Sequence, residues 1–403
     1  MGVSSETHPF VDRIRHSLAT LGWDRGSTVV AVSGGGDSIG LLLAMNTICR
    51  STNSPLWAAH FNHGLRGPES DEDELFVRQR CEHLGIPVRV GRPSRPVEGC
   101  GAGGSLEHAA RVARYRFLLA VAHECQAKFV LTAHTADDQV ETVLFRVIRG
   151  TGLRGLAGIP SRRTVPGGPI FLRPLLNFWR DEVRSFLAEL GEEFREDSSN
   201  RDLRFTRNRI RQELLPLLER NYHPGVRKAL WRLSSLAQDL VAFTSFAVQR
   251  SLANAVLEED FQRVVLDAGQ LVGLPQLLLT ESLRHIWRQR GWPEGKMSWK
   301  HWRQLGDMVR LAAGLTEREA PSSDSTPLIP RQDGEDSSCL DSRDAKAVGP
   351  TGVSSPHFAE EHGFGDRPQE TPRPSLRQTF PGRIEVIVRP GSVELRWQGG
   401  IED

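Results

Sequence analysis

Cysteine is scarce in this chain and its few copies stand far apart. Only 5 of the 403 residues are cysteines, and no two of them form a C-x-x-C pair. Zinc ribbons and iron–sulfur sites need closely spaced thiolates, and disulfide frameworks need a denser set. The sequence therefore argues against these classes and is typical of a protein from the reducing cytosol.

Long apolar runs and a strong net charge are also absent. No stretch approaches the roughly 20 apolar residues needed to cross a bilayer, and the first residues do not form a secretory signal. We therefore expect a cytoplasmic protein with no membrane partner. Because the formal net charge is only +1, any surface for nucleic acid must come from local clustering of basic residues.

The most informative stretch, Ser27 to Ala44, lacks the residues of two common phosphate-binding loops. Asp37 stands where a Walker loop needs lysine, and Ile39 stands where a dinucleotide fingerprint needs its last glycine. What remains is a β-branched run, the turn SGGGDS and a helical pattern. Such a turn points backbone N–H groups and a helix N-terminus at an anion. An ordinary glycine turn is the alternative, but an acid inside a phosphate cradle suggests Mg²⁺ bound with a nucleotide.

Short apolar runs alternate with helical patterns through the first half of the chain. This alternation predicts an α/β fold with a doubly wound parallel sheet, followed by a mainly helical second domain. Ligands of such sheets gather at the carboxyl ends of the strands. Three polar segments follow predicted strands and can converge there: 33–38, 60–66 and 134–141.

Two further groups of residues indicate chemistry. Asp138 and Glu141 are three apart near the start of a predicted helix, so they can bind a metal or an ammonium group. An equally good explanation is that these two acids only stabilise the helix dipole and bind no ligand. Nearby, in the predicted helix from residue 105 to 122, Arg114 can stabilise charge during phosphoryl or adenylyl transfer, although a solvated arginine explains it as well.

An arginine-rich segment, DSSNRDLRFTRNRIR, spans residues 197–211 and contains Asp202 as its one internal acid. Arginines spaced among asparagines and a phenylalanine suit contact with an RNA backbone or another polyanion. A solvated helix start is the alternative, but acids are expected there. The candidate RNA-binding residues are Arg201, Arg204, Arg207, Arg209 and Arg211.

With these motifs in place, the first half of the chain resembles the tRNA(Ile)-lysidine synthase family of PP-loop ATP pyrophosphatases. The matching segments, in order, are SGGGDS at 33–38, HFNHGLR at 60–66, the arginine-containing helix at 107–115, AHTADDQVET at 133–142, RGTGLRGLAGIP at 149–160, RPLL at 173–176 and the segment at 197–211.

The resemblance implies a ligase that forms a carbon–nitrogen bond in two steps. ATP adenylates the C2 oxygen of the wobble cytidine in tRNA(Ile) with a CAU anticodon and releases pyrophosphate, and the ε-amine of free L-lysine then attacks C2 and expels AMP. Carried over by motif, the ATP-binding residues are Ser33, Gly34, Gly35, Gly36, Asp37, Ser38 and His60. Asp37 and Arg114 are the catalytic residues, with Mg²⁺ at Asp37, and Asp138 with Glu141 holds the lysine α-ammonium group.

The resemblance also organises the rest of the chain. We expect a catalytic PP-loop domain over 1–212, a helical tRNA-binding domain over 213–318, a low-complexity insertion over 319–375 and a β-hairpin over 376–403. A homodimer is compatible with this architecture. The competing functions are a PP-loop tRNA thiolase, which would need paired cysteines, and an inactive RNA-binding homologue.

Overall fold

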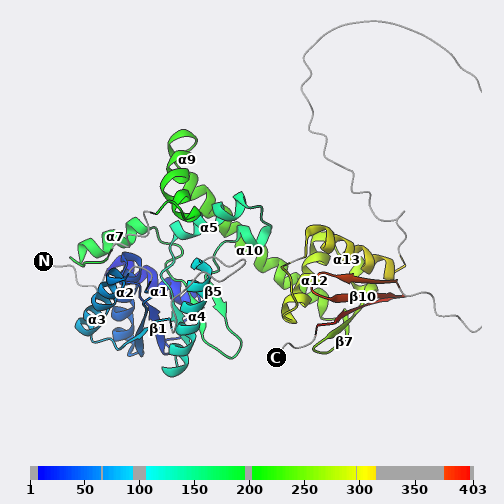
Figure 1. Cartoon of the computed structure of the whole chain (residues 1–403), viewed down its shortest axis with the longest axis horizontal. Helices are drawn as coiled ribbons and strands as arrows, with labels where there is room; N and C mark the ends of the chain where they lie inside the picture. The colour runs from blue at the N-terminus through cyan, green and yellow to red at the C-terminus, as the bar shows by residue number, and fades with distance from the viewer. Residues whose placement is uncertain are drawn as a thin grey trace, which may run out of the picture. The chain divides into compact units, whose positions relative to one another are not determined.

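The computed structural model describes residues 8–64, 67–93, 106–195, 202–295, 297–314 and 376–399. Its contacts divide the chain into two units, Met1–Phe243 and Thr244–Asp403 (Figure 1). Arg201 and the predicted insertion over 319–375 lie outside the described residues.

The first unit is built on a six-stranded sheet in the order β3-β2-β1-β4-β6-β5. All neighbouring pairs are parallel except β5 with β6, so the predicted doubly wound parallel sheet is confirmed. The sequence patterns predict no strands within residues 162–172, where the structure forms β5 and β6. The strands are β1 (Thr28–Ala31), β2 (Leu56–Phe61), β3 (Val88–Gly91), β4 (Phe129–Leu131), β5 (Arg162–Thr164) and β6 (Ile170–Leu172).

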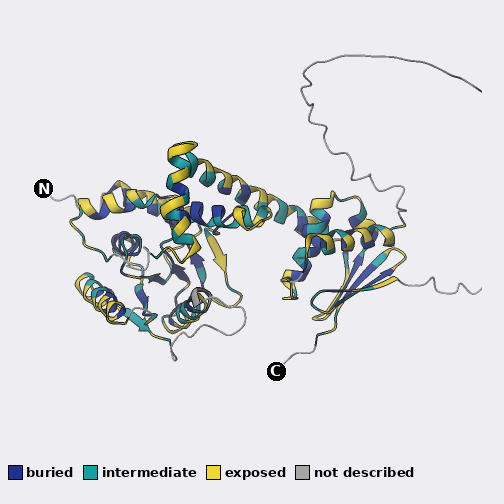
Figure 2. Cartoon of the chain, turned by 45° about the horizontal axis from the view of Figure 1, so that its top comes forward, coloured by how far each residue is buried: buried dark blue, intermediate teal, exposed yellow. Residues whose placement is uncertain are grey.

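Helices cover both faces of this sheet because successive strand residues point to opposite sides. Val30 and Leu131 pack in one core with helices α1, α2, α3 and α7, whereas Val29 and Val130 pack in another with α4. Figure 2 shows strands buried between helices whose outer sides are exposed. The helices are α1 (Pro9–Thr20), α2 (Gly36–Thr52), α3 (Pro68–Leu84), α4 (Leu106–Glu124) and α7 (Arg180–Glu189).

The strand order reverses at β1, which lies between β2 and β4. Helix α2, which follows β1, packs on one face of the sheet, and α4, which leads into β4, packs on the other. In folds of this kind, ligands bind at the carboxyl ends of the two strands where the order reverses. Helix α2 begins beyond β1, and helix α5 (Ala136–Ile148) begins beyond β4. The SGGGDS turn and the pair Asp138 and Glu141 are therefore brought to the same edge of the sheet.

The first unit extends further along the chain than the predicted boundary at residue 212. Side chains of Ile210 and Leu215 pack against Val140 and Leu144 of α5. These contacts hold the segments beyond residue 205 against the catalytic core and move the division to Phe243. The segments are α8 (Thr206–Arg209), a π-helical turn (Ile210–Leu214), α9 (Leu215–Asn221) and α10 (Val226–Leu252); the short α6 (Leu153–Leu156) precedes them in the chain.

The second unit contains an antiparallel sheet in addition to the predicted helices. Its strand order is β7-β8-β11-β10-β9, and the hairpin predicted near the chain end is β10 with β11. The side chains of Trp287 and Trp302 are buried between this sheet and the helices. The elements are β7 (Val256–Glu259), β8 (Arg263–Asp267), α11 (Ala268–Val272), α12 (Gln276–Gln289), α13 (Trp299–Ala312), β9 (Leu376–Phe380), β10 (Ile384–Arg389) and β11 (Ser392–Trp397).

Membrane-spanning helices are not found in the described part of the chain. None of its helices combines the length and the apolar character needed to cross a bilayer.

Candidate active site

The SGGGDS turn folds into a compact loop at the start of α2. Gly34 adopts φ +95°, a left-handed conformation that other residues rarely take. The Ser38 hydroxyl donates to the Gly35 carbonyl at 2.8 Å, and the Ser33 backbone N–H donates to the Ser38 Oγ at 3.1 Å. Because the first N–H groups of a helix have no intrahelical acceptor, this turn presents donors to an anion.

Asp37 lies in the first turn of α2 and faces acids from α5. Burial raises the pKa of Asp37 to about 6; the nearby Arg180 guanidinium opposes this shift, and the charge of Asp138 adds to it. The Arg180 Nε is 3.4 Å from the Asp37 Oδ2. A cation beside Asp37 therefore stabilises the ionised form of its carboxylate.

Asp138 and Glu141 meet arginines rather than open solvent. One oxygen of Asp138 accepts from the Thr135 backbone N–H at 2.9 Å, which caps α5, while the other faces Arg180 and Arg207. Arg180 Nη1 donates to Glu141 at 2.7 Å, and Arg207 Nε donates to it at 3.0 Å. The pair predicted to bind a cation is already neutralised by two cations of the chain.

The balance of burial and charge sets the state of Asp138. Burial would raise its pKa, but Arg180 and Arg207 together hold the pKa of Asp138 well below its ordinary value. The carboxylate is therefore ionised across the physiological range. We call Asp37, Asp138, Glu141, Arg180 and Arg207 the charge cluster.

His60 ends β2 beside the same loop and is 4% exposed. Its Nδ1 lies 2.9 Å from the Val32 carbonyl, and its Nε2 has no hydrogen-bond partner within the described structure. Burial lowers the pKa of His60, so the ring is neutral. An unpaired buried nitrogen at this position can accept from, or donate to, a bound ligand.

His134 follows β4 and connects the charge cluster to further arginines. Burial lowers the pKa of His134 to about 3, and the charges of Asp138, Arg173 and Arg114 also act on it. Its Nδ1 lies 2.9 Å from the Thr132 hydroxyl. The neutral imidazole is therefore within electrostatic reach of Arg114 of α4, Arg173 after β6 and Asp138.

The arginines predicted to bind RNA do not share one environment. Arg204 donates to Asp202, and Arg209 donates to the Thr206 hydroxyl at 3.4 Å. Arg207 belongs to the charge cluster, and Arg211 lies 3.8 Å from Glu141. The RNA-binding role of these residues stays a prediction, but the structure gives two of them acidic partners inside the site.

Metal binding at this edge would depend on few protein ligands. The described residues contain no group of three or more His, Cys, Asp or Glu side chains suited to a metal.

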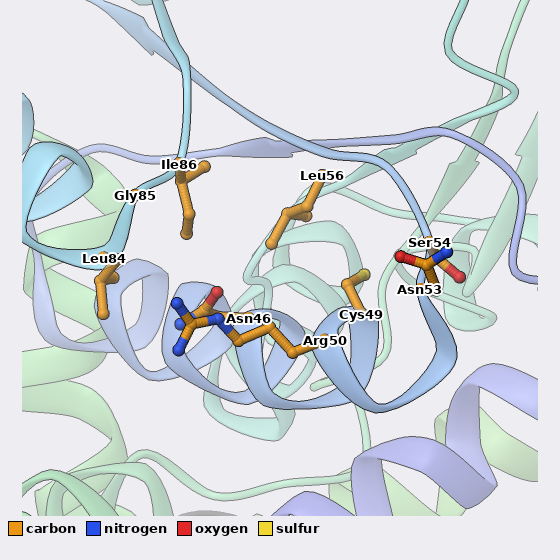
Figure 3. A pocket seen from close by; sticks show the side chains of 9 residues that line it. All are labelled: Asn46, Cys49, Arg50, Asn53, Ser54, Leu56, Leu84, Gly85 and Ile86. Atoms are coloured by element: carbon orange, nitrogen blue, oxygen red, sulfur yellow. The ribbon is translucent and has the colours of Figure 1, made fainter.

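A pocket of about 220 Å³ lies elsewhere, between the end of α2 and the starts of β2 and β3 (Figure 3). It is at the amino ends of the strands and takes no part in the site.

Comparison with known proteins identifies the family. The PP-loop domain family matches residues 7–218. The tRNA(Ile)-lysidine synthase of Rhodopirellula baltica is 33% identical over 318 residues, which cover 70% of this chain and 79% of that protein. The chain belongs to the tRNA(Ile)-lysidine synthase family.

Other tRNA(Ile)-lysidine synthases align over different shares of their length. That of Bacteroides thetaiotaomicron is 34% identical over 74% of this chain and 69% of that protein. That of Geobacter sulfurreducens is 42% identical over 57% of this chain and 48% of that protein. The solved structure of the U34-tRNA thiolase NcsA from Methanococcus maripaludis superposes with a TM-score of 0.48 at 21% identity, over 59% of this chain and 84% of that chain.

Sequence reasoning missed the cations of the tRNA(Ile)-lysidine synthase site. The sequence predicts no role for Arg180, predicts only RNA contact for Arg207, and includes Arg173 only as part of the motif RPLL. One signal was available for Arg180, which opens α7. Because a cation at a helix N-terminus opposes the helix dipole, its presence there indicates acidic partners from elsewhere in the fold.

Proposed function

We propose that this protein ligates free L-lysine to C2 of the wobble cytidine of tRNA(Ile) with a CAU anticodon. ATP first adenylates the oxygen on C2 and releases pyrophosphate, and the lysine ε-amine then attacks C2 and displaces AMP. One observation carries the proposal: Arg180 bridges Asp37 of the phosphate-binding turn to Asp138 and Glu141. A nucleotide site and a cation site thus share one counter-ion, as a reaction that joins an adenylate to an amine requires.

The SGGGDS turn is the ATP site in this proposal. The N-terminus of α2 and the hydroxyls of Ser33 and Ser38 bind the phosphates, and His60 offers its unpaired Nε2 to the adenosine. Mg²⁺ fits a site of this kind, because it commonly takes one carboxylate together with substrate phosphates and water. Asp37 supplies that carboxylate, and the ion neutralises phosphate charge when bound.

Arg114 supplies positive charge for the adenylyl transfer. It lies on α4 within electrostatic reach of His134 and Tyr115, at the carboxyl edge of the sheet. A preorganised guanidinium stabilises charge that develops on phosphate oxygens during transfer. Arg114 and Asp37 are therefore the proposed catalytic residues for the first step.

Lysine enters the charge cluster by exchange of ion pairs. Its α-ammonium group takes the place of an arginine at Asp138 and Glu141, and the displaced guanidinium receives the lysine α-carboxylate. Arg207 suits this exchange better than Arg180, since its side chain is 37% exposed against 14%. The exchange keeps every charge paired, which a buried site requires. The ε-amine must be neutral to attack, so its ordinary pKa has to be lowered in the site.

The tRNA and the assembly complete the proposal. Arg204 and Arg209 remain the accessible members of the predicted RNA-binding segment. Arg201 lies outside the described residues. The homodimer and the cytoplasmic location stay predictions.

The deciding experiment incubates the protein with ATP, Mg²⁺, labelled lysine and a CAU-anticodon isoleucine tRNA transcript. We expect AMP release and lysine retained on the tRNA, and neither with methionine tRNA as substrate. AMP without retained lysine would favour another nucleophile, as in a thiolase. Binding of tRNA with neither product would favour an inactive RNA-binding homologue.

A further inference from the structure

Tyr115 of α4 is surrounded by arginines from three elements. Arg111 lies one turn earlier on α4, with its guanidinium carbon 5.1 Å from the Tyr115 ring centre. Arg163 of β5 places the same atom 5.8 Å from that centre. Arg173 donates from Nη2 to the Tyr115 hydroxyl at 3.2 Å. We call these four residues the Tyr115 patch; its helix α4 and strand β5 lie side by side in Figure 1.

Acidic partners are missing from this patch within the described residues. No described carboxylate forms an ion pair with Arg111, Arg163 or Arg173, although most arginines near the site have one. Arg173 is 3% exposed and uses a backbone carbonyl, that of Pro160, as its other acceptor at 2.6 Å. Its Nε is buried and has no hydrogen-bond partner among the described atoms.

The excess positive charge acts on Tyr115 itself. Burial would raise the pKa of Tyr115, but Arg173, Arg111 and Arg114 together hold that pKa below its ordinary value. The uncharged Tyr115 hydroxyl thus occupies a position beside these arginines that an acidic side chain would otherwise take. A cluster of cations that lacks acidic partners is stabilised when a polyanionic ligand binds and compensates its charge.

The position of the patch relates it to the site. Helix α4 connects β3 to the parallel strand β4, so its first turns lie at the carboxyl ends of the strands. Arg173 follows β6, the neighbour of β4, and its charge reaches His134. The patch therefore borders the site beside β4 and β6, whereas the phosphate-binding turn follows β1.

From this geometry we infer that the exposed arginines of the Tyr115 patch, Arg111 and Arg163, bind backbone phosphates of the anticodon loop while its wobble base enters the site. The inference rests on the proposed function and assigns the RNA contact to residues outside the segment 197–211. Arg207 and Arg211 of that segment face acids, which leaves the Tyr115 patch as the acid-free group of arginines next to the site. Guanidinium groups stacked on an aromatic ring keep their N–H edges free for phosphate oxygens.

The test uses the full chain with Arg111→Gln and Arg163→Gln combined, leaving the buried Arg173 in place. The matched control combines Arg50→Gln, on α2 at the opposite edge of the sheet, with Arg116→Gln, on the outer side of α4. Binding of an RNA hairpin with the CAU anticodon loop is measured over a series of KCl concentrations. A third variant, Arg111→Lys with Arg163→Lys, keeps the charge but loses the planar groups stacked on Tyr115.

We expect the glutamine pair to weaken RNA binding roughly tenfold and to reduce the salt slope by about 0.7 for each lost contact. The control pair should bind like the unaltered protein, and the lysine pair should keep the salt slope. An unchanged slope in the glutamine pair would overturn the inference. A raised KM for ATP with normal RNA binding would also overturn it, because the patch would then be a triphosphate subsite. RNA binding is measured without turnover, so an absence of lysidine formation would count against the proposed function alone.

Discussion

The Arg180 guanidinium donates to Glu141 at 2.7 Å while its Nε faces Asp37 at 3.4 Å, so one side chain joins two parts of the site. Its side chain is 14% exposed, and its loss would leave Asp138 and Glu141 with Arg207 as their main counter-ion. A buried carboxylate deprived of its partner is costly. Arg180 is therefore a structural requirement of the site as well as a link between its halves.

We predict that Arg180→Gln lowers the free energy of unfolding by about 3 kcal/mol at neutral pH. The folded-state pKa of Asp138 is depressed, so its stabilising contribution is present above its unfolded pKa and is lost as pH falls through the folded value. Without Arg180 that contribution shrinks. The stability gap between variant and parent should thus narrow as pH falls from about 4 to about 2, as measured by urea unfolding.

Arg13→Gln is the control for this prediction. Arg13 also pairs with an acid of α7, Glu182, but at an exposed position outside the charge cluster. It should lower stability by less than about 1 kcal/mol with no change of the gap over this pH range. A constant gap for Arg180→Gln would contradict the assigned coupling to Asp138.

Exchange of ion pairs at Arg207 predicts how amines are selected. We expect L-lysine to be used well, but cadaverine, which lacks the carboxylate, and 6-aminohexanoate, which lacks the α-amine, to be poor substrates. Arg207→Gln should raise the KM for L-lysine about tenfold, the value of one charged contact, and reduce its advantage over cadaverine. Steady-state kinetics with the three amines measures this.

Arg204→Gln supplies the comparison for that experiment. Arg204 lies three residues earlier and pairs with Asp202, away from the charge cluster. Its loss should leave the KM for L-lysine unchanged and act, if anywhere, on tRNA. Equal effects of the two variants on L-lysine would refute a direct contact between Arg207 and the amino acid.

Much of this site could be predicted because its acids lie in local patterns. The turn SGGGDS follows an apolar strand, and Asp138 and Glu141 are neighbours on one helix, so short-range rules indicate both. The partners of Arg180 are 143, 42 and 39 residues away in sequence, and only the strand order β1-β4-β6 brings them together. The strands β5 and β6 were missed because three residues each give no periodic signal.

Asp37 should make the protein less stable at neutral pH than at mildly acidic pH. Its pKa is raised from 3.8 to about 6, so the folded state holds a proton that the unfolded state loses between these values. The free energy of unfolding therefore falls as pH rises from 4 to 6. Asp37→Asn removes this loss and should be more stable by about 3 kcal/mol at pH 8, but equally stable at pH 4.

In the proposed reaction the same carboxyl must be ionised to bind the metal ion of ATP. We expect the rate of AMP formation to fall below pH 6, and Asp37→Asn to abolish it at every pH. Thermal unfolding and AMP release on the same samples separate the two effects. A variant that is less stable at pH 8 would show that the contact with Arg180 outweighs the burial of the charge.

Gln139 is predicted to hold the glycine-rich loop 149–160 against α5. Its Nε2 donates to the Ala157 carbonyl at 2.9 Å, and its Oε1 accepts from the Ile159 backbone N–H at 2.7 Å. Gly158, between them, approaches the Gln139 amide so closely that a Cβ would lie 2.6 Å from it. This one buried side chain therefore supplies the loop backbone with both a donor and an acceptor.

Gln139→Ala should lower the free energy of unfolding by about 2 kcal/mol, because the buried Ile159 backbone N–H loses its acceptor and the Ala157 carbonyl loses one of its two donors. Limited proteolysis should then cleave the loop faster, since its anchoring to α5 is weakened. Gln249→Ala, at an exposed position of α10, is the matched control and should change neither property.

Gln238 of α10 also donates to the Ala157 carbonyl, at 2.9 Å. The free energy of unfolding should therefore fall by more in Gln139→Ala combined with Gln238→Ala than the sum of the two single changes. Strict additivity would mean that the two glutamines hold the loop independently.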